Sequence, residues 1–162
     1  MEQDSTDIRP GERLAHLAPA EDACLRFIGR IATPFLTRED CPRQGDLDGP
    51  VCRLEVDPPW SDALDGIEAF ETIEVLYWLH ESRRDLITQS PRGDGQTRGT
   101  FSLRSPVRPN PIGTSCVRLV RREGAVLVVR GLDCLDGTPL LDIKPDRCAY
   151  TPQVAEKAAD HG

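Results

Sequence analysis

The chain has 162 residues, 38% of them hydrophobic and 29% charged, with a net charge of −7. This length and composition predict one soluble globular domain with its own hydrophobic core and argue against a disordered chain. The absence of an apolar run of about 18 residues argues against a transmembrane helix, and the polar N-terminus lacks the apolar core of a secretory signal.

The first third of the chain predicts short strands separated by loops. Residues 1–24 are polar and predict either a disordered arm or one short helix. Residues 25–35 predict a strand that ends at Pro34, and residues 37–50 predict a loop because they are rich in Pro, Gly and Asp. Residues 51–57 alternate apolar and polar side chains, which is typical of a half-buried strand.

The next segment predicts a helical turn, a strand and a loop. Residues 58–70 are expected to form a turn and a short helix with Ser61 as the N-cap. Residues 70–82 are rich in β-branched and aromatic side chains and predict a central strand that runs through His80. Residues 82–97 predict a polar loop.

The second half of the chain again predicts short strands. In chain order, strands are expected over residues 98–106, 115–122, 125–132 and 140–145. The first two are connected by a loop stiffened by prolines, the second and third by a turn at Glu123 and Gly124, and the last two by a tight turn over residues 133–139. The two strands around Gly124 predict a β-hairpin. Five to seven strands with little helix predict a mainly β single domain, either a β-barrel with short helices or an α+β domain dominated by sheet. We expect this domain over residues 25–150, followed by a polar tail over 151–162.

The six cysteines predict neither a metal site nor a disulfide framework. They are Cys24, Cys41, Cys52, Cys116, Cys134 and Cys148. None forms a C-x-x-C pair, and no histidine has zinc-finger spacing from them. We therefore expect reduced, partly buried thiols, as in a cytoplasmic protein, and no bound metal.

The charge is distributed unevenly. A net charge of −7 argues against a large RNA-binding surface. Residues 83–130, however, hold ten arginines and only three acids, Asp85, Asp94 and Glu123. A local basic face within an acidic protein is therefore compatible with the sequence.

The proline-rich loop R-P-N-P-I-G spans residues 108–113. Pro109 and Pro111 restrict the backbone on either side of Asn110, so its amide is held in place. Gly113 allows a close backbone approach or a positive φ. Rigid loops of this kind commonly present a functional site. A stiff connector between strands is the alternative, and the residues alone favour it.

The segment L-D-G-T-P-L-L-D-I-K-P spans residues 135–145. Asp136 and Gly137 predict a turn, whose backbone groups, with the Asp136 carboxylate and the Thr138 hydroxyl, can hydrogen-bond a small polar ligand. An ordinary hairpin turn is the alternative, and the residues alone favour it. Asp142 and Lys144 lie two residues apart on one strand face, which predicts a surface ion pair of little energetic consequence.

Three other groups of polar residues are candidates for ligand contacts. Arg43 in the loop C-P-R-Q suits a carboxylate, because its planar fork can donate two hydrogen bonds; a solvated loop is the alternative. His80 and Glu81 end an apolar strand and could cap a pocket, although a lone histidine there is more often structural. Arg104 could neutralise a carboxylate or a phosphate. No P-loop or dinucleotide-binding glycine motif is present.

These motifs together resemble the TrmO/TsaA-like family. The resemblance is carried by FSLRSPVRPNPIG, SCVRL and GLDCLDGTPLLDIKP, in that order and spacing, and more weakly by FIGRIATPF, CPRQG and DGIEAFETIEVLYWLHES upstream. It covers roughly residues 25–147. The paired proline-loop and D-G-T-P motifs are specific enough to favour a site over the connector and the ordinary hairpin turn.

The resemblance implies a small β-barrel that works as a homodimer and binds S-adenosylmethionine. It further implies methylation of threonylcarbamoyl-adenosine beside the tRNA anticodon. The implied cofactor-binding residues are Pro42, Arg43, Gln44, His80, Glu81, Arg104, Leu135, Asp136, Gly137 and Thr138. The implied catalytic residues are His80, Arg108, Asn110 and Asp136.

Several departures from the family pattern leave the methyl acceptor more open than the cofactor. Glu81 stands where the family often has Gln, Asp146 replaces a usual Tyr, the loop before Arg98 is short, and a C-terminal extension found in many bacterial members does not follow. Two alternatives therefore stay open: methylation of a small metabolite, or a non-catalytic S-adenosylmethionine-binding module that regulates a partner.

Overall fold

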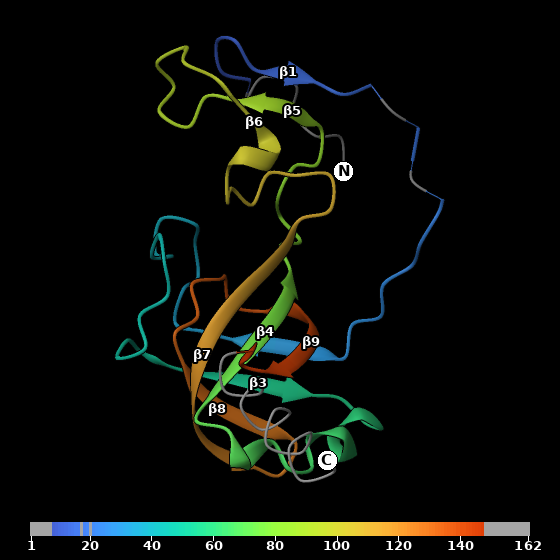
Figure 1. Cartoon of the computed structure of the whole chain (residues 1–162), viewed down its shortest axis with the longest axis vertical. Helices are drawn as coiled ribbons and strands as arrows, with labels where there is room; N and C mark the ends of the chain where they lie inside the picture. Colours follow the sequence, from blue (N-terminus) through green and yellow to red (C-terminus); the bar gives the residue numbers. More distant parts are fainter. Residues whose placement is uncertain (1–7, 17, 20, 148–162) are drawn as a thin grey trace, which may run out of the picture. The chain divides into compact units, whose positions relative to one another are not determined.

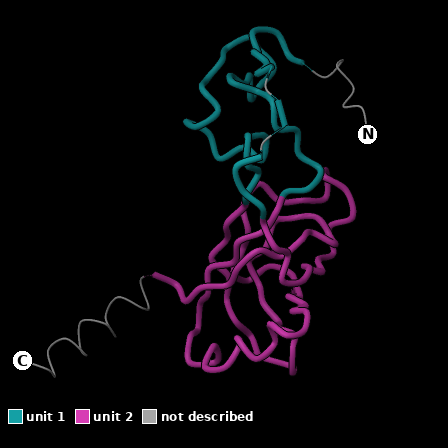
Figure 2. The backbone as a smooth tube through the Cα atoms, turned by 90° about the vertical axis from the view of Figure 1, so that its right-hand side faces the viewer, with its two compact units in different colours: residues 1–24, 79–112 teal, residues 25–78, 113–162 magenta. Residues whose placement is uncertain are grey.

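The computed structural model describes residues 8–16, 18–19 and 21–147, and the chain divides into two compact units (Figure 2). Unit 1 comprises residues 1–24 and 79–112, and unit 2 comprises residues 25–78 and 113–162. The separate unit formed by residues 79–112 has no counterpart among the sequence-based predictions, and the predicted tail lies outside the described residues.

Unit 2 contains a closed six-stranded barrel in the order β2-β3-β8-β7-β4-β9 (Figure 1). Its strands are β2 (Gly29–Ala32), β3 (Val51–Val56), β4 (Thr72–Trp78), β7 (Ile112–Glu123), β8 (Val126–Arg130) and β9 (Thr138–Pro145). The sequence-based prediction of a mainly β fold with a barrel is therefore confirmed.

Alternating side chains form the barrel interior. On β3, Cys52, Leu54 and Val56 are buried, whereas Val51 and Arg53 are exposed. The strand β4 alternates in the same way. Because successive strand residues point to opposite faces, one apolar set lines the core. The predicted half-buried strand over residues 51–57 is confirmed.

The predicted hairpin is also confirmed. The strands β7 and β8 pair antiparallel, and Glu123 faces Val126 across the turn. Gly124 adopts a φ of +63° there, a backbone conformation that glycine reaches without steric cost. The register shifts between Leu119 and Arg121, which is typical of a β-bulge.

The predicted helix after residue 58 is wrong in type and in its cap. The segment forms two 3-10 helices, η1 (Trp60–Leu64) and η2 (Ile67–Ala69). Pro59 is the N-cap of η1, and the backbone N–H of Trp60 donates to Asp57 O at 2.9 Å, so Ser61 lies inside the helix. No helix in the described part of the chain is long and apolar enough to cross a membrane.

The predicted strand through His80 is too long. The strand β4 ends at Trp78, and the Ser82 N–H donates to Leu79 O at 3.0 Å. This hydrogen bond closes a turn with His80 and Glu81 at its two central positions.

Unit 1 holds a small sheet in the order β1-β5-β6. Its elements are β1 (Arg13–Leu14), β5 (Leu86–Gln89), β6 (Arg98–Gly99) and the 3-10 helix η3 (Thr100–Ser102). Three predictions are corrected here: β1 lies in the segment expected as an arm or a helix, β5 lies in the expected loop, and the strand expected over 98–106 is replaced after Gly99 by η3. The Leu103 N–H donates to Thr100 O at 3.2 Å, which turns the chain out of extended geometry.

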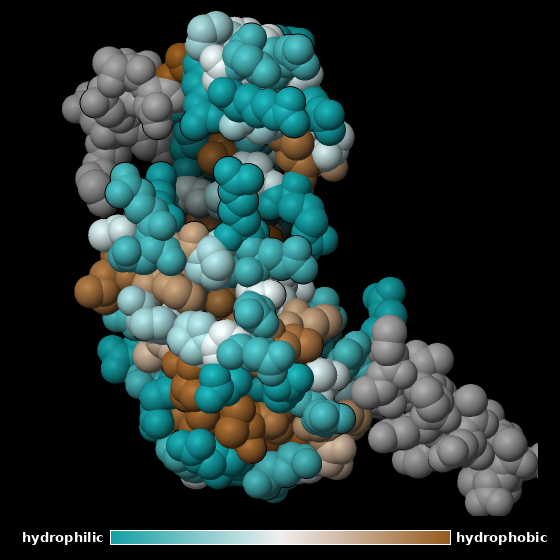
Figure 3. Space-filling model, turned by 90° about the vertical axis from the view of Figure 1, so that its left-hand side faces the viewer, coloured by the Kyte–Doolittle hydropathy of each residue, from teal (hydrophilic) through white to brown (hydrophobic). Residues whose placement is uncertain are grey.

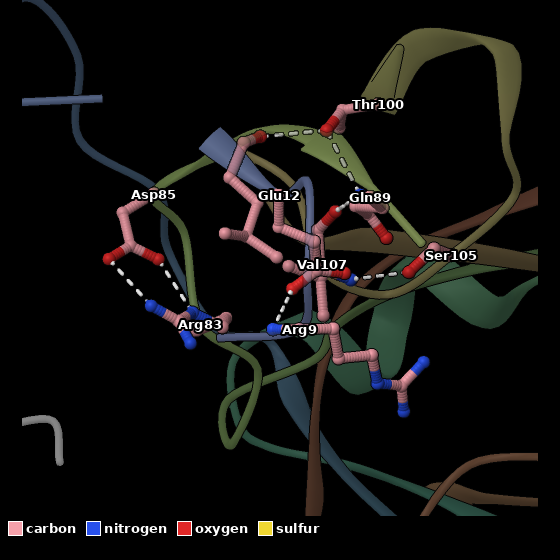
Figure 4. A network of polar contacts seen from close by, with 9 residues as sticks. Arg9, Glu12, Arg83, Asp85, Gln89, Thr100, Ser105 and Val107 are labelled. Carbon is pink, nitrogen blue, oxygen red and sulfur yellow. Dashed lines mark hydrogen bonds and ion pairs between the residues drawn. The ribbon is translucent and has the colours of Figure 1, made fainter. Parts of the chain in front are cut away.

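Long-range polar contacts hold unit 1 together (Figure 4). The Arg9 guanidinium donates to Ser90 O at 2.9 Å, and Glu12 accepts from the Ser90 N–H at 2.8 Å. The Gln89 side-chain amide donates to Val107 O at 2.7 Å. These bonds tie the N-terminal segment to residues 79–112, so the described part of that segment belongs to a folded unit.

The described cysteines are free thiols in environments of different polarity. Cys24 and Cys116 are exposed, Cys41 is intermediate, and Cys52 and Cys134 are buried; Cys148 lies outside the described residues. Burial raises the pKa of Cys52 to about 11 and the pKa of Cys134 to about 12. Both thiols therefore stay protonated in the folded protein at neutral pH.

We expect the protein to lose stability as the pH rises above about 8.5. An unfolded thiol deprotonates there, whereas the folded thiol of Cys134 holds its proton, so unfolding releases a proton. Each such thiol lowers the free energy of unfolding by about 1.4 kcal/mol per pH unit until its folded pKa is reached. Urea unfolding between pH 9.5 and 11 should show a shallower pH dependence for Cys134→Ala and an unchanged one for Cys24→Ala. An unchanged slope in Cys134→Ala would contradict this account.

Candidate functional site

The turn over residues 135–138 leads into β9. The Thr138 N–H donates to Leu135 O at 3.3 Å, and Gly137 has a φ of +78°. A turn with positive φ at its third position favours glycine, which explains the D-G pair. The Thr138 side chain is buried, and its hydroxyl donates to Leu135 O at 2.7 Å. Towards a ligand, that hydroxyl could therefore only accept a hydrogen bond.

This turn is fixed to β2 and to the segment that follows it. The Gly137 N–H donates to Ile31 O and the Asp136 N–H to Phe35 O, both at 2.8 Å. The Oδ1 atom of Asp136 accepts from the Thr33 N–H at 3.0 Å. The other carboxylate oxygen, Oδ2, has no hydrogen-bond partner among the described residues. The turn thus presents one rigidly placed acceptor on an exposed residue.

The loop over residues 42–44 is anchored to the barrel by the glycine that follows it. A Cβ atom at Gly45 would lie 1.8 Å from Gly131 O, so the two backbones are in direct contact. Pro42, Arg43 and Gln44 are exposed. Within the described ranges, the Arg43 guanidinium has neither a hydrogen bond nor an ion pair. The Arg43 guanidinium is therefore available to a ligand, and its loop is held by the backbone contact between Gly45 and Gly131.

A buried tyrosine connects two of the sequence motifs within unit 2. Tyr77 is 3% exposed, and its hydroxyl lies 2.8 Å from Asp133 Oδ1 and 2.8 Å from Ser115 Oγ. A Cβ atom at Gly113 would lie 2.2 Å from the Tyr77 ring. The prediction that Gly113 permits a close approach is therefore confirmed, and its partner is Tyr77.

The proline loop lies in unit 1 up to residue 112. The Leu79 N–H donates to Pro111 O at 2.8 Å, and the Arg84 guanidinium donates to Pro109 O at 2.6 Å. Asn110 is exposed, and its Oδ1 accepts from Arg84 at 3.4 Å. The loop is thus held from two sides, with the Asn110 amide on its surface.

The other implied residues of unit 1 differ in how far they are engaged. Arg108 donates to Leu103 O at 3.2 Å and to Ser105 O at 3.0 Å, which gives it a structural role within its own loop. His80 Nε2 lies 4.0 Å from Glu81 Oε1, and both side chains are exposed. Arg104 is exposed and has no ion-pair or hydrogen-bond partner in the part of the chain that the structure describes.

The implied site residues therefore fall into two groups. Unit 2 holds residues 42–44 and 135–138, and unit 1 holds His80, Glu81, Arg104, Arg108 and Asn110. Among the described residues, no group of three or more His, Cys, Asp and Glu side chains could hold a metal ion.

The sequence-based reasoning missed Thr33, Tyr77 and Asp133. Tyr77 lies in a segment whose β-branched and aromatic side chains predict a central strand, and nothing in that pattern marks its hydroxyl. Asp133 lies inside the quoted motif GLDCLDGTP and was passed over as part of a turn. The available signal for Asp133 as a site residue was its position, two residues before Leu135 of the implied cofactor turn.

Comparisons with known proteins identify the family. The model of the tRNA-methyltransferase O N-terminal domain matches residues 30–154. The chain is 57% identical to the "Probable S-adenosyl-L-methionine-binding protein VirR" of Rhizobium radiobacter, over 91% of this chain and 85% of VirR. It is 41% identical to an S-adenosyl-L-methionine-binding protein of Archaeoglobus fulgidus, over 80% of this chain and 91% of that protein.

A solved structure agrees with this assignment. The crystal structure of TrmO from Pseudomonas aeruginosa matches with a TM-score of 0.65 and 35% identity over 79% of this chain. The match covers 56% of the length of that TrmO chain. The barrel, the two motif loops and these similarities agree. The chain therefore belongs to the family of tRNA-methyltransferase O N-terminal domains.

Proposed function

We propose that this protein binds S-adenosylmethionine and transfers its methyl group to N6 of threonylcarbamoyl-adenosine beside the tRNA anticodon. The observation that carries the proposal is the turn over residues 135–138, which the barrel fixes with one Asp136 oxygen left free. Family membership and relatives named for S-adenosylmethionine binding support it. With tRNA as the acceptor, the protein would act in the cytoplasm.

The polar groups of the implied residues suit this cofactor. The free Asp136 oxygen and the carbonyls of the turn can accept hydrogen bonds from the hydroxyls and amino group of an adenosine. The unpaired guanidinium of Arg43 or Arg104 can bind a carboxylate. When bound, the cofactor supplies an electrophilic methyl group on a sulfonium. The protein's contribution is mainly to align the acceptor nitrogen with that group.

Unit 1 carries groups that can hydrogen-bond a methyl acceptor. The Asn110 amide, on a loop held by Arg84 and Leu79, can hydrogen-bond a base or a carbamoyl group. No strong base is required if the acceptor nitrogen loses its proton late. If a base acts, His80, Glu81 or Asp136 could accept the proton.

The charge of residues 79–112 favours a polyanionic acceptor. This segment holds six arginines and three acids, although the whole chain carries −7. Arg92, Arg98 and Arg104 are exposed without partners among the described residues, whereas the β7 arginines Arg118, Arg121 and Arg122 pair with acids. On the face drawn in Figure 3, the surface of unit 1 is mostly hydrophilic.

An exposed aromatic ring accompanies these arginines. Phe101, on η3 between Arg98 and Arg104, is 81% exposed. Unpaired bases of single-stranded RNA commonly stack on such rings, with arginines neutralising the phosphates. An anticodon loop offers both groups, so Phe101 is suited to stack on a base of that loop.

A different acceptor is the second candidate. The net charge of −7 favours a small metabolite over RNA, and the relatives named only for binding S-adenosylmethionine are compatible with a regulatory module without turnover.

Transfer from tritiated S-adenosylmethionine separates these functions. We expect label in tRNA that carries threonylcarbamoyl-adenosine and none in tRNA that lacks the modification. Phe101→Ala should lower the transfer to tRNA about tenfold by removing a stacking contact worth ~1–3 kcal/mol, with cofactor affinity unchanged. Label only in small molecules of an extract would favour the metabolite, and cofactor binding without any transfer would favour the regulatory module.

We further propose that the protein works as a homodimer. Leu25, Phe27 and Leu36 of unit 2 are 54%, 50% and 75% exposed, and association would remove these apolar side chains from water. Light scattering after size-exclusion chromatography should give twice the 17.9 kDa chain mass; the mass of one chain would contradict the proposal.

A further inference from the structure

A chain of hydrogen bonds inside unit 2 ends on a carboxylate. Ser115 Oγ, Tyr77 Oη and Asp133 Oδ1 are linked in series by two contacts of 2.8 Å. Burial raises the pKa of Tyr77, so its hydroxyl keeps its proton and donates to Asp133. Ser115 then donates to the Tyr77 oxygen, which has no second proton to give. The orientation of the Asp133 carboxylate is therefore set by a buried side chain.

Asp133 has one oxygen left for another partner. Only Oδ1 takes part in the contacts with Tyr77 and Ser115, and Oδ2 has no hydrogen-bond partner among the described residues. Asp133 is neither fully buried nor fully exposed. No described cationic side chain forms an ion pair with Asp133. A negative charge is thus held in a fixed orientation without a protein counter-charge.

Asp133 is also close along the chain to residues that belong to, or contact, the two unit 2 segments proposed to bind the cofactor. It precedes Leu135, the first residue of the turn, by two positions. On the other side, Asp133 follows Gly131 by two positions, and a Cβ atom at Gly45, the residue after the 42–44 loop, would lie 1.8 Å from Gly131 O. A molecule that contacts both the 135–138 turn and the 42–44 loop would therefore pass close to Asp133.

We propose that Asp133 interacts with the positively charged sulfonium of S-adenosylmethionine, and that Tyr77 is the positioning residue that aims this carboxylate. The inference rests on the proposed cofactor. In that molecule the sulfonium joins the adenosyl part to the methionine part. With the adenosine at the turn and the carboxylate at Arg43, Asp133 would be a residue able to meet the sulfonium.

A carboxylate at this position would distinguish the charged cofactor from its neutral product. S-adenosylhomocysteine, the product, has the same adenosine and amino-acid groups but a neutral thioether. A carboxylate near the sulfur therefore favours the substrate cofactor over the product by Coulomb attraction, and the gain at about 4 Å corresponds to roughly a tenfold or greater difference in affinity near a protein surface. Product release would be helped by the same residue that binds the reactant.

The test is calorimetric titration of the full chain with both molecules. Asp133→Asn keeps the shape and an acceptor for the Tyr77 hydroxyl but removes the charge. We expect it to weaken S-adenosylmethionine binding about tenfold and to leave S-adenosylhomocysteine binding within about twofold. Tyr77→Phe should lower the ratio of S-adenosylmethionine affinity to S-adenosylhomocysteine affinity about threefold, because the Asp133 carboxylate is then no longer held in place.

Asp142→Asn is the matched control. Asp142 forms an exposed ion pair with Lys144 at 2.5 Å, as the spacing predicted. The Asp142→Asn substitution should leave both affinities unchanged. If Asp133→Asn weakens both molecules equally, or neither, the inference is overturned, while the proposed function stands as long as the wild-type chain binds S-adenosylmethionine. If the wild-type chain binds neither molecule, the proposed function itself fails.

Discussion

Gly45→Ala should destabilise the protein by about 3 kcal/mol, because the added methyl group has no space. Its Cβ would lie 1.8 Å from Gly131 O and 2.6 Å from the Gly131 carbonyl carbon. Both are backbone atoms, so no side chain can rotate away. Either the loop over residues 42–44 or the chain after β8 must move. We expect a melting temperature lower by roughly 6–12 °C and an affinity for S-adenosylmethionine lower by about tenfold.

Gly99→Ala is the control for this substitution. Gly99 has a φ of −59°, which alanine adopts readily, and no atom lies within 4 Å of its added Cβ. Differential scanning calorimetry should find it within ~0.5 kcal/mol of the wild type. A Gly45→Ala variant as stable as Gly99→Ala would contradict the backbone contact.

Gly113→Ala should also be strongly destabilising, by about 2–3 kcal/mol, because its Cβ would lie 2.2 Å from the Tyr77 ring. The ring has little freedom to move, since Tyr77 is buried and its hydroxyl is bonded to Asp133 and Ser115. Urea unfolding measures the effect. The variant should also lower the S-adenosylmethionine to S-adenosylhomocysteine affinity ratio, because displacing the ring displaces Asp133.

A double-mutant cycle isolates the contact between these two residues. Tyr77→Leu removes the ring and opens space at Gly113. In that background Gly113→Ala should cost less than ~1 kcal/mol, so the two substitutions should be strongly non-additive. The same cost in both backgrounds would show that the strain at Gly113 has another source.

The mainly β fold was predictable from local residue patterns, and the family resemblance selected the barrel over an α+β domain. Residues 51–57 alternate in polarity, β4 is rich in β-branched and aromatic side chains, and Gly124 marks the hairpin between β7 and β8. Those signals are local, so they can be read without knowing which strands pair. The role of Gly113 as a point of close approach was likewise predictable, although its partner was not.

Unit 1 could not be predicted for the opposite reason. The strands β1 and β6 have two residues each, and β1 exists because Arg13 and Leu14 pair with β5, more than 70 positions later. Such short strands have no periodicity of their own. The contacts of Arg9 and Glu12 with Ser90 are equally distant in the chain.

The candidate site was predictable only through its motifs. The D-G turn and the proline loop were readable from local residue types. The series Ser115, Tyr77 and Asp133 was not, because it joins β7, β4 and the loop between β8 and β9, and it exists only once the barrel has closed. The sequence of an apolar strand does not indicate which groups will hydrogen-bond the hydroxyl of a tyrosine within it.

Titration of the purified chain with S-adenosylmethionine tests the central claim most directly. We predict saturable binding to the wild type. Asp136→Ala and Arg43→Ala should each weaken it at least about tenfold, because each removes a charged hydrogen-bonding group, and Lys144→Ala should leave it unchanged, because that exposed side chain pairs with Asp142. An absence of binding heat, or an affinity unaffected by both Asp136→Ala and Arg43→Ala, would contradict the account.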